Sequence, residues 1–411
     1  MPYTQLNNLD FIDIKTALKE YMRAQTDFTD YDFEGSAISQ LLDVLAYNTY
    51  YTAFNTNMVV NELFLDSASL RDNVVSLAKQ LGYSPKSKTA PKAAVNLSLT
   101  FSNSSPVSVT IKAGSGFLTN YDGSLYRFIV TEDYKEIVTN GTVSFANLPI
   151  YEGSLITSLT TVDSSASNQR FIIDNPSTDI STLKVRVYES INSTESELYI
   201  KANNILDVTS DDKVYFVNEI EDEKYEIFFG DGVLGKKLED NQVVELSAVV
   251  TNGDATNGAS TFRFNGTIVN ESNSLIQIPY NVTELTVIQN ALGGADIESI
   301  DNIKYNAPKF YGSQNRAVTS NDFASIVRNI YPSVSDIIVF GGEDQVPPAY
   351  GKVFLSVKPT DATTLSAFTK NDLTSNLKKY TVASIRPEFV DPSILYVELN
   401  SDIYYSSTKT K

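Results

Sequence analysis

Residues 316–358 are the part of this chain whose local structure the sequence constrains most tightly. Thr319 stands where a helix begins and Asp322 follows three residues later, so each side chain can accept a backbone N–H that has no partner inside the helix. Apolar residues then recur at helical spacing, at Phe323, Ile326, Val327 and Ile330. Glycines and prolines separate the strands predicted at 334–340 and 352–358. The pattern predicts a compact scaffold unit and contains no arrangement typical of a catalytic site.

The alternation of helices and strands extends from residue 291 to the end of the sequence. Further helices are predicted at 297–305 and 370–380, and further strands at 388–390 and 394–405. After Thr319 the order α-β-β-α-β predicts a small sheet with helices on one face, which we interpret as a ferredoxin-like α+β domain. Because the sequence stops at Lys411 directly after a predicted strand, we expect it to continue in a longer protein.

The first 88 residues are predicted to form a helical domain. Helices are expected at 9–23 and 36–65, and the second would be roughly 45 Å long at about 1.5 Å per residue. A third helix is expected to have Ser67 as its N-cap and to end at Gly82.

The second of these helices carries a stripe of large side chains at helical spacing, Tyr47, Tyr51, Phe54 and Met58. Burial inside the same domain is one explanation of the stripe. However, so short a helical segment offers little core in which to hide one face of a long helix, and Tyr and Met are frequent at protein interfaces. We therefore predict that these four residues contact another subunit.

From residue 89 to 290 the pattern changes to short strands separated by Gly, Asn, Asp and Ser. Alternation of apolar and polar residues, as at 95–101 and 183–188, predicts antiparallel sheets. The length favours two β modules, divided within the polar segment 161–170. The predicted fold is a multidomain α+β protein with a helical domain at 1–88, β modules at 89–165 and 166–290, and an α+β domain at 291–411.

The composition excludes several kinds of chemistry. The 411 residues include no histidine and no cysteine. Their absence excludes Ser-His-Asp and Cys-His catalysis and most zinc or iron sites, so no cofactor and no metal is predicted. The net charge of −18 disfavours binding to nucleic acid and to anionic membranes. No apolar run approaches the roughly 20 residues of a membrane helix.

Gly230, Gly232 and Gly235 match the spacing of a dinucleotide-binding fingerprint and follow a predicted strand at 225–229. That fingerprint requires a helix next, because the helix N-terminus binds the pyrophosphate. Here the following segment leads into another strand at 243–250. We therefore predict a turn between strands rather than a nucleotide site.

Five carboxylates occur between residues 219 and 226, namely Glu219, Glu221, Asp222, Glu223 and Glu226. Such a cluster could bind calcium or supply the two carboxylates of a glycosidase. The spacing does not match a calcium-binding loop of the EF-hand type. A solvated hairpin loop is the interpretation that the sequence favours.

Three segments occur in an order that resembles the baseplate J-like family of contractile tails. They are Phe228–Lys236, Thr251–Gly258, and Arg316–Thr319 together with Tyr350–Val353. In addition, Asp32–Ser36 and the tyrosine-rich helix after it resemble the large inner wedge proteins of T-even-type phages. The resemblance covers nearly the whole chain.

The resemblance implies a structural role without catalysis. Such a protein would form baseplate wedges with other wedge proteins and further copies of itself, join the wedges in a ring around the tail hub, and transmit the rearrangement at infection. It would reside in the virion, at the tail baseplate, after assembly in the host cytoplasm. No cofactor, small-molecule substrate, nucleic acid or membrane partner is implied.

Two other classes of function remain open from the residues alone. A carboxylate-based polysaccharide-active enzyme, or a sugar-binding β protein, could use the cluster at 219–226, and loss of turnover after one Glu→Gln change would identify the enzyme. A β-rich adhesion module is the third class, and it would lie at the tail periphery rather than around the hub.

Overall fold

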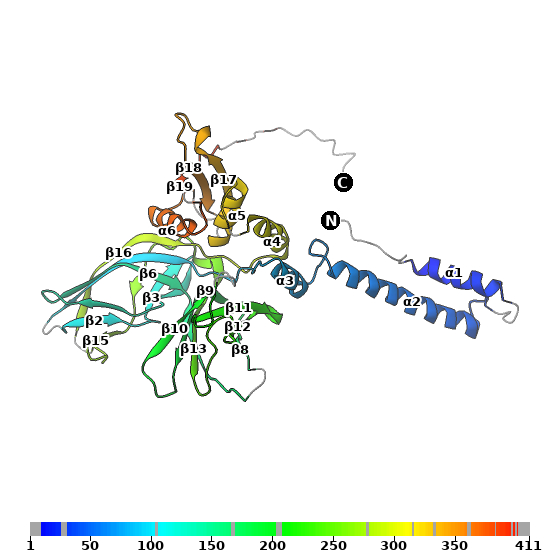
Figure 1. The fold of residues 1–411 in the computed structure, drawn as a ribbon, viewed down its shortest axis with the longest axis horizontal. Coiled ribbons are helices and arrows are strands. Elements are labelled where there is room, and N and C mark those ends of the chain that lie inside the picture. Colours follow the sequence, from blue (N-terminus) through cyan, green and yellow to red (C-terminus); the bar gives the residue numbers. More distant parts are fainter. Residues whose placement is uncertain are drawn as a thin grey trace. The chain divides into compact units, whose positions relative to one another are not determined.

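The computed structural model describes residues 10–25, 31–102, 106–165, 169–202, 208–276, 279–314, 316–331, 334–359, 363–382, 384–395, 398 and 401. The chain divides into two compact units, Met1–Asn315 and Arg316–Lys411, each of which is described by itself. Figure 1 shows their helices and strands, coloured along the sequence. A helical N-terminal region, several sheets and a C-terminal α+β portion are present, which confirms the predicted α+β multidomain class at this level.

The described α-helices of the first unit lie near its two ends in the sequence: α1 Phe11–Arg23, α2 Ala37–Glu62, α3 Arg71–Gln80 and α4 Ile300–Ser313. Helices α1 and α2 lie side by side (Figure 1), and Lys15 Nζ lies 2.6 Å from the Asp43 carboxylate between them. Helices α3 and α4 share a small core that includes Val74 and Ile303. The helical N-terminal prediction is therefore confirmed, with shifted ends.

The predicted N-cap Ser67 is wrong. Helix α3 begins after Leu70, which makes no side-chain cap bond, and the Ser67 hydroxyl instead donates to the Asn61 carbonyl at 2.6 Å. The predicted helix at 297–305 begins later, because Ser299 accepts the Asn302 N–H and caps α4 there.

Most strands of the first unit belong to two large sheets. The six-stranded sheet has the order β14 (Arg263–Phe264), β3 (Gly116–Tyr121), β4 (Ser124–Ile129), β6 (Thr142–Glu152), β1 (Lys92–Phe101) and β16 (Tyr280–Leu292). The seven-stranded sheet has the order β7 (Ser154–Thr161), β13 (Val243–Val250), β9 (Thr178–Tyr188), β10 (Ser196–Lys201), β11 (Val214–Ile220), β12 (Lys224–Phe229) and β8 (Phe171–Ile173). All their described pairings are antiparallel, as predicted, except β10 with β11.

A third, three-stranded sheet has the order β15 (Ile268–Asn270), β2 (Ser108–Ile111) and β5 (Tyr134–Ile137). Its Ile111 and Ile268 share one core with Leu97 and Phe117 of the six-stranded sheet, so the two sheets pack as layers. The seven-stranded sheet has its own core, which includes Val185 and Ile227.

The chain enters the first β region twice. Strand β16, at residues 280–292, pairs with β1 along nearly its whole length, from Phe101 opposite Tyr280 to Lys92 opposite Leu292. Strand β7 already belongs to the second sheet although it ends at Thr161. Two β regions are present, and a single division near residue 165 does not separate them in the sequence.

The second unit consists of α5 (Ser320–Ile330), β17 (Val334–Gly341), β18 (Lys352–Pro359), α6 (Ala367–Leu377) and β19 (Arg386–Val390). Both halves of the predicted capping box are formed, since Thr319 accepts the Asp322 N–H and the Asp322 carboxylate accepts the Thr319 N–H at 2.8 Å. Phe323 and Leu373 of the two helices share a core with Leu355 of β18, which places both helices against one face of the sheet.

The sheet of this unit has β18 in the centre, antiparallel to β17 and parallel to β19. A ferredoxin-like sheet would have a further strand between β18 and β19, because its βαβ connection is split. No such strand occurs among the described residues, and the ferredoxin-like detail stays a prediction. Most of the strand predicted at 394–405 lies outside the described residues.

Candidate interaction surfaces

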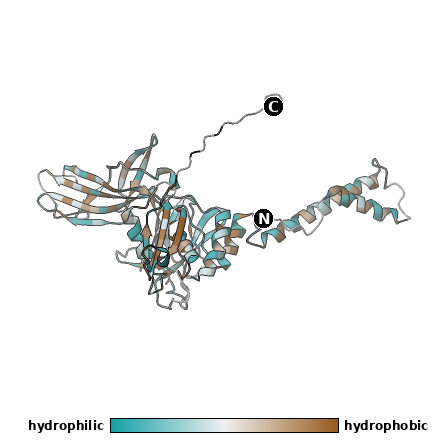
Figure 2. Cartoon of the chain, turned by 90° about the horizontal axis from the view of Figure 1, so that it is seen from above, coloured by the Kyte–Doolittle hydropathy of each residue, from teal (hydrophilic) through white to brown (hydrophobic). Residues whose placement is uncertain are grey.

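Helix α2 presents large apolar side chains to solvent. Tyr47, Tyr51, Phe54 and Met58 are between 41% and 55% exposed, and hydrophobic positions recur along this helix in Figure 2. The Tyr47 hydroxyl donates to the Tyr51 hydroxyl at 3.0 Å, and the two rings meet edge to face with centroids 4.7 Å apart. Further apolar side chains are exposed along the helix and just after it: Leu41, Val44, Leu45, Val59, Leu63 and Phe64.

The same helix is almost free of charge. Its 26 residues include no Lys or Arg, and Asp43 and Glu62 are its only carboxylates. Depletion of charge together with enrichment of Tyr, Phe and Met is typical of the central part of protein interfaces. The predicted contact of the four-residue stripe with another subunit is compatible with this exposure and stays a prediction.

Glu62, at the C-terminal end of α2, holds the beginning of α3. Its carboxylate accepts hydrogen bonds from the Ser69 N–H at 2.7 Å, the Leu70 N–H at 3.2 Å and the Asn73 amide at 2.9 Å. Because Leu70 cannot cap α3 with its own side chain, Glu62 supplies the missing acceptor from seven or more residues away. One carboxylate at the end of α2 therefore holds the first turn of α3.

These hydrogen bonds make the α2–α3 connection pH-dependent. Desolvation raises the pKa of Glu62, but the hydrogen bonds from Ser69, Asn73 and Leu70 outweigh it and lower the pKa from 4.5 to about 2. A lowered carboxyl pKa contributes stability above pH 4.5 that is lost as the pH falls toward 2.

We expect Glu62→Gln to destabilise the first turn of α3 by about 1 kcal/mol at neutral pH, as for the loss of a helix cap. Hydrogen exchange at the backbone of α3 measures this, and the difference from the wild type should close as the pH approaches 2. Glu20→Gln, an exposed change on α1, is the control and should leave α3 unaffected. A pH-independent difference would contradict this account.

Arg71 connects three segments that are far apart in the sequence. Its Nε and Nη2 donate to the two Glu219 carboxylate oxygens at 2.7 Å and 3.2 Å, and its Nη1 donates to the Glu298 carbonyl at 2.6 Å. The Arg71 side chain is 15% exposed and the Glu219 side chain 3%. Burial raises the pKa of Glu219, and the hydrogen bonds and charge of Arg71 oppose that shift.

The Glu298 carboxylate is a second buried junction next to the first. It accepts from the Tyr83 hydroxyl at 2.7 Å, from the Lys86 N–H at 3.1 Å and from the Asn306 amide at 2.8 Å. Burial and the neighbouring Glu298 charge raise the pKa of Tyr83 far above its usual range, so Tyr83 remains a hydrogen-bond donor at all ordinary pH values. Together the two junctions fix α3 and α4 to the end of β11.

The acidic cluster at 219–226 is only partly the solvated loop that we predicted. Glu221–Glu223 form a short turn between β11 and β12, whereas Glu226 is bound by Arg170, whose Nη2 donates to it at 2.9 Å. The hydrogen bonds from Arg170 lower the pKa of Glu226. With Glu219 paired to Arg71 as well, both ends of the cluster serve structural ion pairs, and the described residues contain no group of carboxylates suited to hold a metal ion.

The glycine-rich segment after β12 is a turn, as predicted. Gly230 and Lys237 form an isolated bridge, and β13 follows without an intervening helix. The Asp231 carboxylate accepts the N–H groups of Val233 and Leu234, while Gly232 and Gly235 take positive φ angles of 92° and 89°. Nothing in this turn offers the helix N-terminus that a dinucleotide requires.

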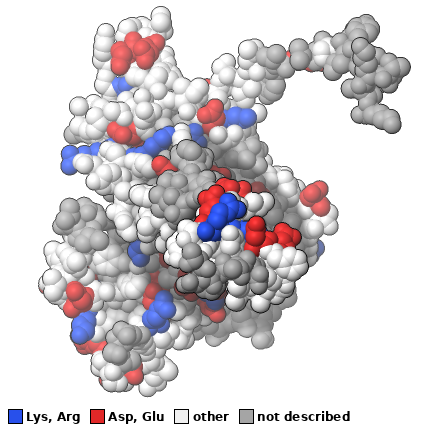
Figure 3. Space-filling view, turned by 90° about the vertical axis from the view of Figure 1, so that its right-hand side faces the viewer, with Lys and Arg blue, Asp and Glu red and all other residues white. Residues whose placement is uncertain are grey.

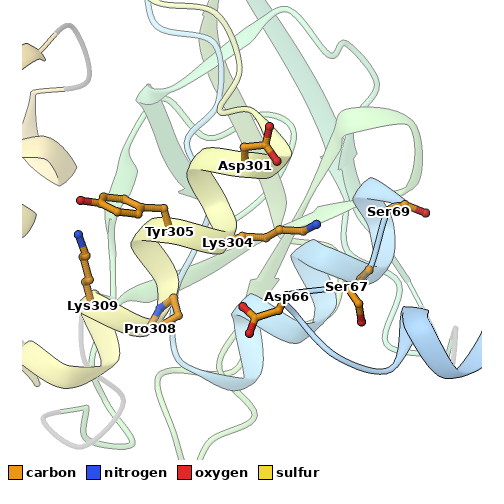
Figure 4. Close-up of a pocket in the computed structure, with 9 residues that line it drawn as sticks. Asp66, Ser67, Ser69, Asp301, Lys304, Tyr305, Pro308 and Lys309 are labelled. Atoms are coloured by element: carbon orange, nitrogen blue, oxygen red, sulfur yellow. The ribbon is translucent and has the colours of Figure 1, made fainter. Parts of the chain in front are cut away.

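A pocket of about 490 Å³ lies between α4 and the α2–α3 connection (Figure 4). Its lining consists of Asp66, Ser67, Ala68, Ser69, Asp301, Lys304, Tyr305, Pro308 and Lys309. In the close-up Lys304 extends toward the side of the pocket that carries Ser67 and Ser69. The lining contains two carboxylates and two lysines, and the Lys309 ammonium lies 3.2 Å from the centroid of the Tyr305 ring. With equal numbers of acidic and basic side chains, the lining favours neither an anionic nor a cationic ligand.

Charge is dispersed over the face of the molecule shown in Figure 3, where acidic and basic side chains form small mixed groups. Among the described helices, none is both long and apolar enough to cross a membrane. Large apolar side chains are exposed on the nearly uncharged helix α2.

Comparisons with known proteins point to one class, the structural proteins of phage baseplate wedges. Residues 10–83 match the helical domain of the baseplate wedge protein gp6-like family, and residues 319–390 match C-terminal domain I of the baseplate structural protein gp6. The two matches lie on the helical region with α2 and on the unit that begins at the Thr319 capping box.

A particular relative is the baseplate wedge protein gp6 of Enterobacteria phage T4, which is 29% identical over 419 residues. The alignment covers 97% of this chain and 61% of the relative, so the chain spans about three fifths of the length of the protein it matches. These matches support a structural baseplate wedge component. The wider resemblance to the baseplate J-like family stays a prediction.

A similar solved structure is a chain of the anti-feeding prophage baseplate, determined by cryo-electron microscopy with six-fold symmetry. It is 13% identical and the match covers 95% of this chain and 80% of that chain, with a TM-score of 0.30. At that score the likeness bears on neither fold nor function.

Proposed function

We propose that this chain is a load-transmitting structural part of a contractile-tail baseplate wedge. It would bind other wedge proteins and further copies of itself, join wedges in a ring around the hub and transmit the rearrangement at infection. The observation that carries the proposal is helix α2, which exposes large apolar side chains, is nearly uncharged and lies within the region similar to the wedge helical domain. The buried Arg71 and Glu298 junctions support a mechanical role, because they tie helices to a sheet.

We propose no enzymatic activity, cofactor, small-molecule substrate, nucleic acid partner or membrane partner. A polysaccharide-active enzyme would need free carboxylates in the acidic cluster. Glu219 and Glu226 instead accept hydrogen bonds from Arg71 and Arg170, respectively. The proposed location is the tail baseplate of the virion after assembly in the host cytoplasm. The boundaries at 88 and 290 and a ferredoxin-like C-terminal domain also remain proposals.

The stripe on α2 provides the test of wedge binding. Replacing Tyr47, Tyr51, Phe54 and Met58 by serine should abolish co-purification with the wedge partners, because buried aromatic anchors at an interface contribute about 2 kcal/mol or more each. Pull-down and size-exclusion chromatography of co-expressed proteins measure the loss.

Leu125→Ser is the matched control, since Leu125 is a large apolar side chain on β4 that is 71% exposed. It should leave the complex intact, and circular dichroism should show unchanged helix content in both variants. A stripe variant that assembles like the wild type would refute the role of α2, and a wild-type chain that ignores every wedge partner would refute the proposed function.

A further inference from the structure

Strand β7 forms one edge of the seven-stranded sheet and pairs only with β13. The pairing is regular over all eight residues, from Ser154 opposite Val250 to Thr161 opposite Val243. Among the described residues, none makes a backbone hydrogen bond to the other side of β7 between 155 and 160. Because alternate N–H and C=O groups of a strand point to opposite sides, this edge has a row of free donors and acceptors.

The sequence of β7 has none of the features that normally protect an edge strand. It reads Ser-Leu-Ile-Thr-Ser-Leu-Thr-Thr and contains no charged residue, no proline and no glycine. The other edges of the two large sheets are protected: β14 has two residues and β8 has three. Strand β16 carries Glu284 and pairs with β1 through three register shifts, which are signs of bulges.

Both ends of β7 are occupied by the chain itself. Leu155 packs in a small cluster with Ala90, Ile129 and Val249. The Thr161 carbonyl accepts a hydrogen bond from the Gln169 side chain at 2.6 Å. The free part of the edge is therefore the segment 156–160, in which Leu159 is 65% exposed.

We propose that residues 156–160 of β7 pair antiparallel with the same residues of a second copy of this chain. A two-fold axis at Ser158 places Ile156 opposite Thr160 and Thr157 opposite Leu159, and it is the register that pairs all five residues. Each sheet then continues into its partner's sheet without an edge at β7.

The lack of charge on β7 favours this edge as the place where a second copy can bind. At a net charge of −18, two copies repel wherever carboxylates meet, and β7 brings none of its own. Glu245 lies beside Leu159 on β13, but it is balanced by Arg186 at 3.3 Å and accepts the Tyr188 hydroxyl at 2.9 Å. Two copies can therefore approach here without facing unpaired carboxylates from these strands.

The absence of cysteine from the sequence allows a direct test of the register. In the purified full chain, Ser158→Cys should form a disulfide-linked dimer on mild oxidation, because residues directly opposite across two strands have Cβ atoms about 4.5–5.5 Å apart. Thr286→Cys, on the protected edge strand β16, is the control and should form no disulfide-linked dimer on the same treatment.

Sedimentation equilibrium tests the same pairing without oxidation. The wild-type chain should be a dimer. Leu159→Lys should raise the dissociation constant of this dimer at least about tenfold, because a lysine on an edge strand hinders its pairing with another strand. Leu198→Lys, on β10 in the interior of the same sheet and 56% exposed, is the matched control and should dimerise as the wild type does.

A wild-type chain that stays monomeric would overturn the proposal, as would a dimer that neither responds to Leu159→Lys nor cross-links through Ser158→Cys. Open-ended aggregates in place of a dimer would also overturn it, because a two-fold pairing uses the same edge of both copies and leaves none for a third.

The pairing rests on the proposed function only for the presence of further copies in the assembly. A wild-type chain that does not dimerise but still binds wedge partners through α2 would refute the pairing and leave the wedge function standing.

Discussion

Replacement of Arg71 by alanine is expected to lower the stability of the contact between α3 and β11 by about 3–5 kcal/mol, as for breaking a buried ion pair by removing one partner. The reason is that the Glu219 carboxylate, 3% exposed, would lose the guanidinium that donates to both of its oxygens. Hydrogen exchange at α3 and at the β11–β12 hairpin measures the effect as local loss of protection.

The pH dependence distinguishes this loss from simple loss of packing. Burial already raises the pKa of Glu219, and removal of the arginine charge raises it further. A raised carboxyl pKa destabilises the fold above that pKa, and the destabilisation disappears as the pH falls below the unfolded value of about 4.3. The deficit of Arg71→Ala should therefore be full at neutral pH and shrink on acidification.

Two further variants separate charge from shape. Adding Glu219→Leu to Arg71→Met removes both charges, and it should restore most of the lost protection, because an apolar pair of similar volume often replaces a buried ion pair. Glu219→Gln on its own keeps the shape and should cost less than Arg71→Ala. An Arg71→Ala protein with wild-type protection at neutral pH would contradict the role of this junction.

The Arg71 junction could not be predicted from the sequence. Arg71 and Glu219 are 148 residues apart, and the only local signal was the acidic cluster at 219–226, which suggested a solvated loop. Which carboxylates of the cluster are buried depends on where α3 packs. That packing is set by tertiary contacts, for which one sequence has no local pattern.

Helix ends with a local chemical signal were predictable, and those without one were not. The Thr319 and Asp322 pair predicted the start of α5 because both partners of the capping box lie within four residues. Ser67 looked equally suitable as a cap, but the acceptor for α3 comes from Glu62 on the preceding helix. A serine before an apolar run is thus a weaker signal than a reciprocal pair.

The sheets show the same limit at a larger scale. Alternation correctly predicted strands at 95–101 and 183–188, because period-two burial is a local property. Strand order is not local, and β16 returns to β1 from almost two hundred residues away. Likewise, β7 has an uncharged sequence that reads as an ordinary strand, and only its position at an edge gives it significance.

Phe323→Ala is expected to destabilise the second unit by about 3–5 kcal/mol, the range for truncating a buried phenylalanine. Phe323 is fully buried and shares a core with Leu355 of β18 and Leu373 of α6, so the cavity would open between both helices and the sheet. For a unit of fewer than one hundred residues that loss is a large fraction of the total stability, typically about 5–15 kcal/mol.

The effect should be confined to the unit that contains the cavity. In the full chain, hydrogen exchange should show lost protection in α5, β17 and β18, while the core around Leu97 in the first unit keeps its wild-type protection. Ile338→Ala is the matched control, because Ile338 is a large apolar side chain on β17 that is 62% exposed, and it should change stability by less than about 0.5 kcal/mol. Equal loss of protection in both units would contradict the independence of their cores, and an unaffected α5 would contradict the central place of Phe323 in this one.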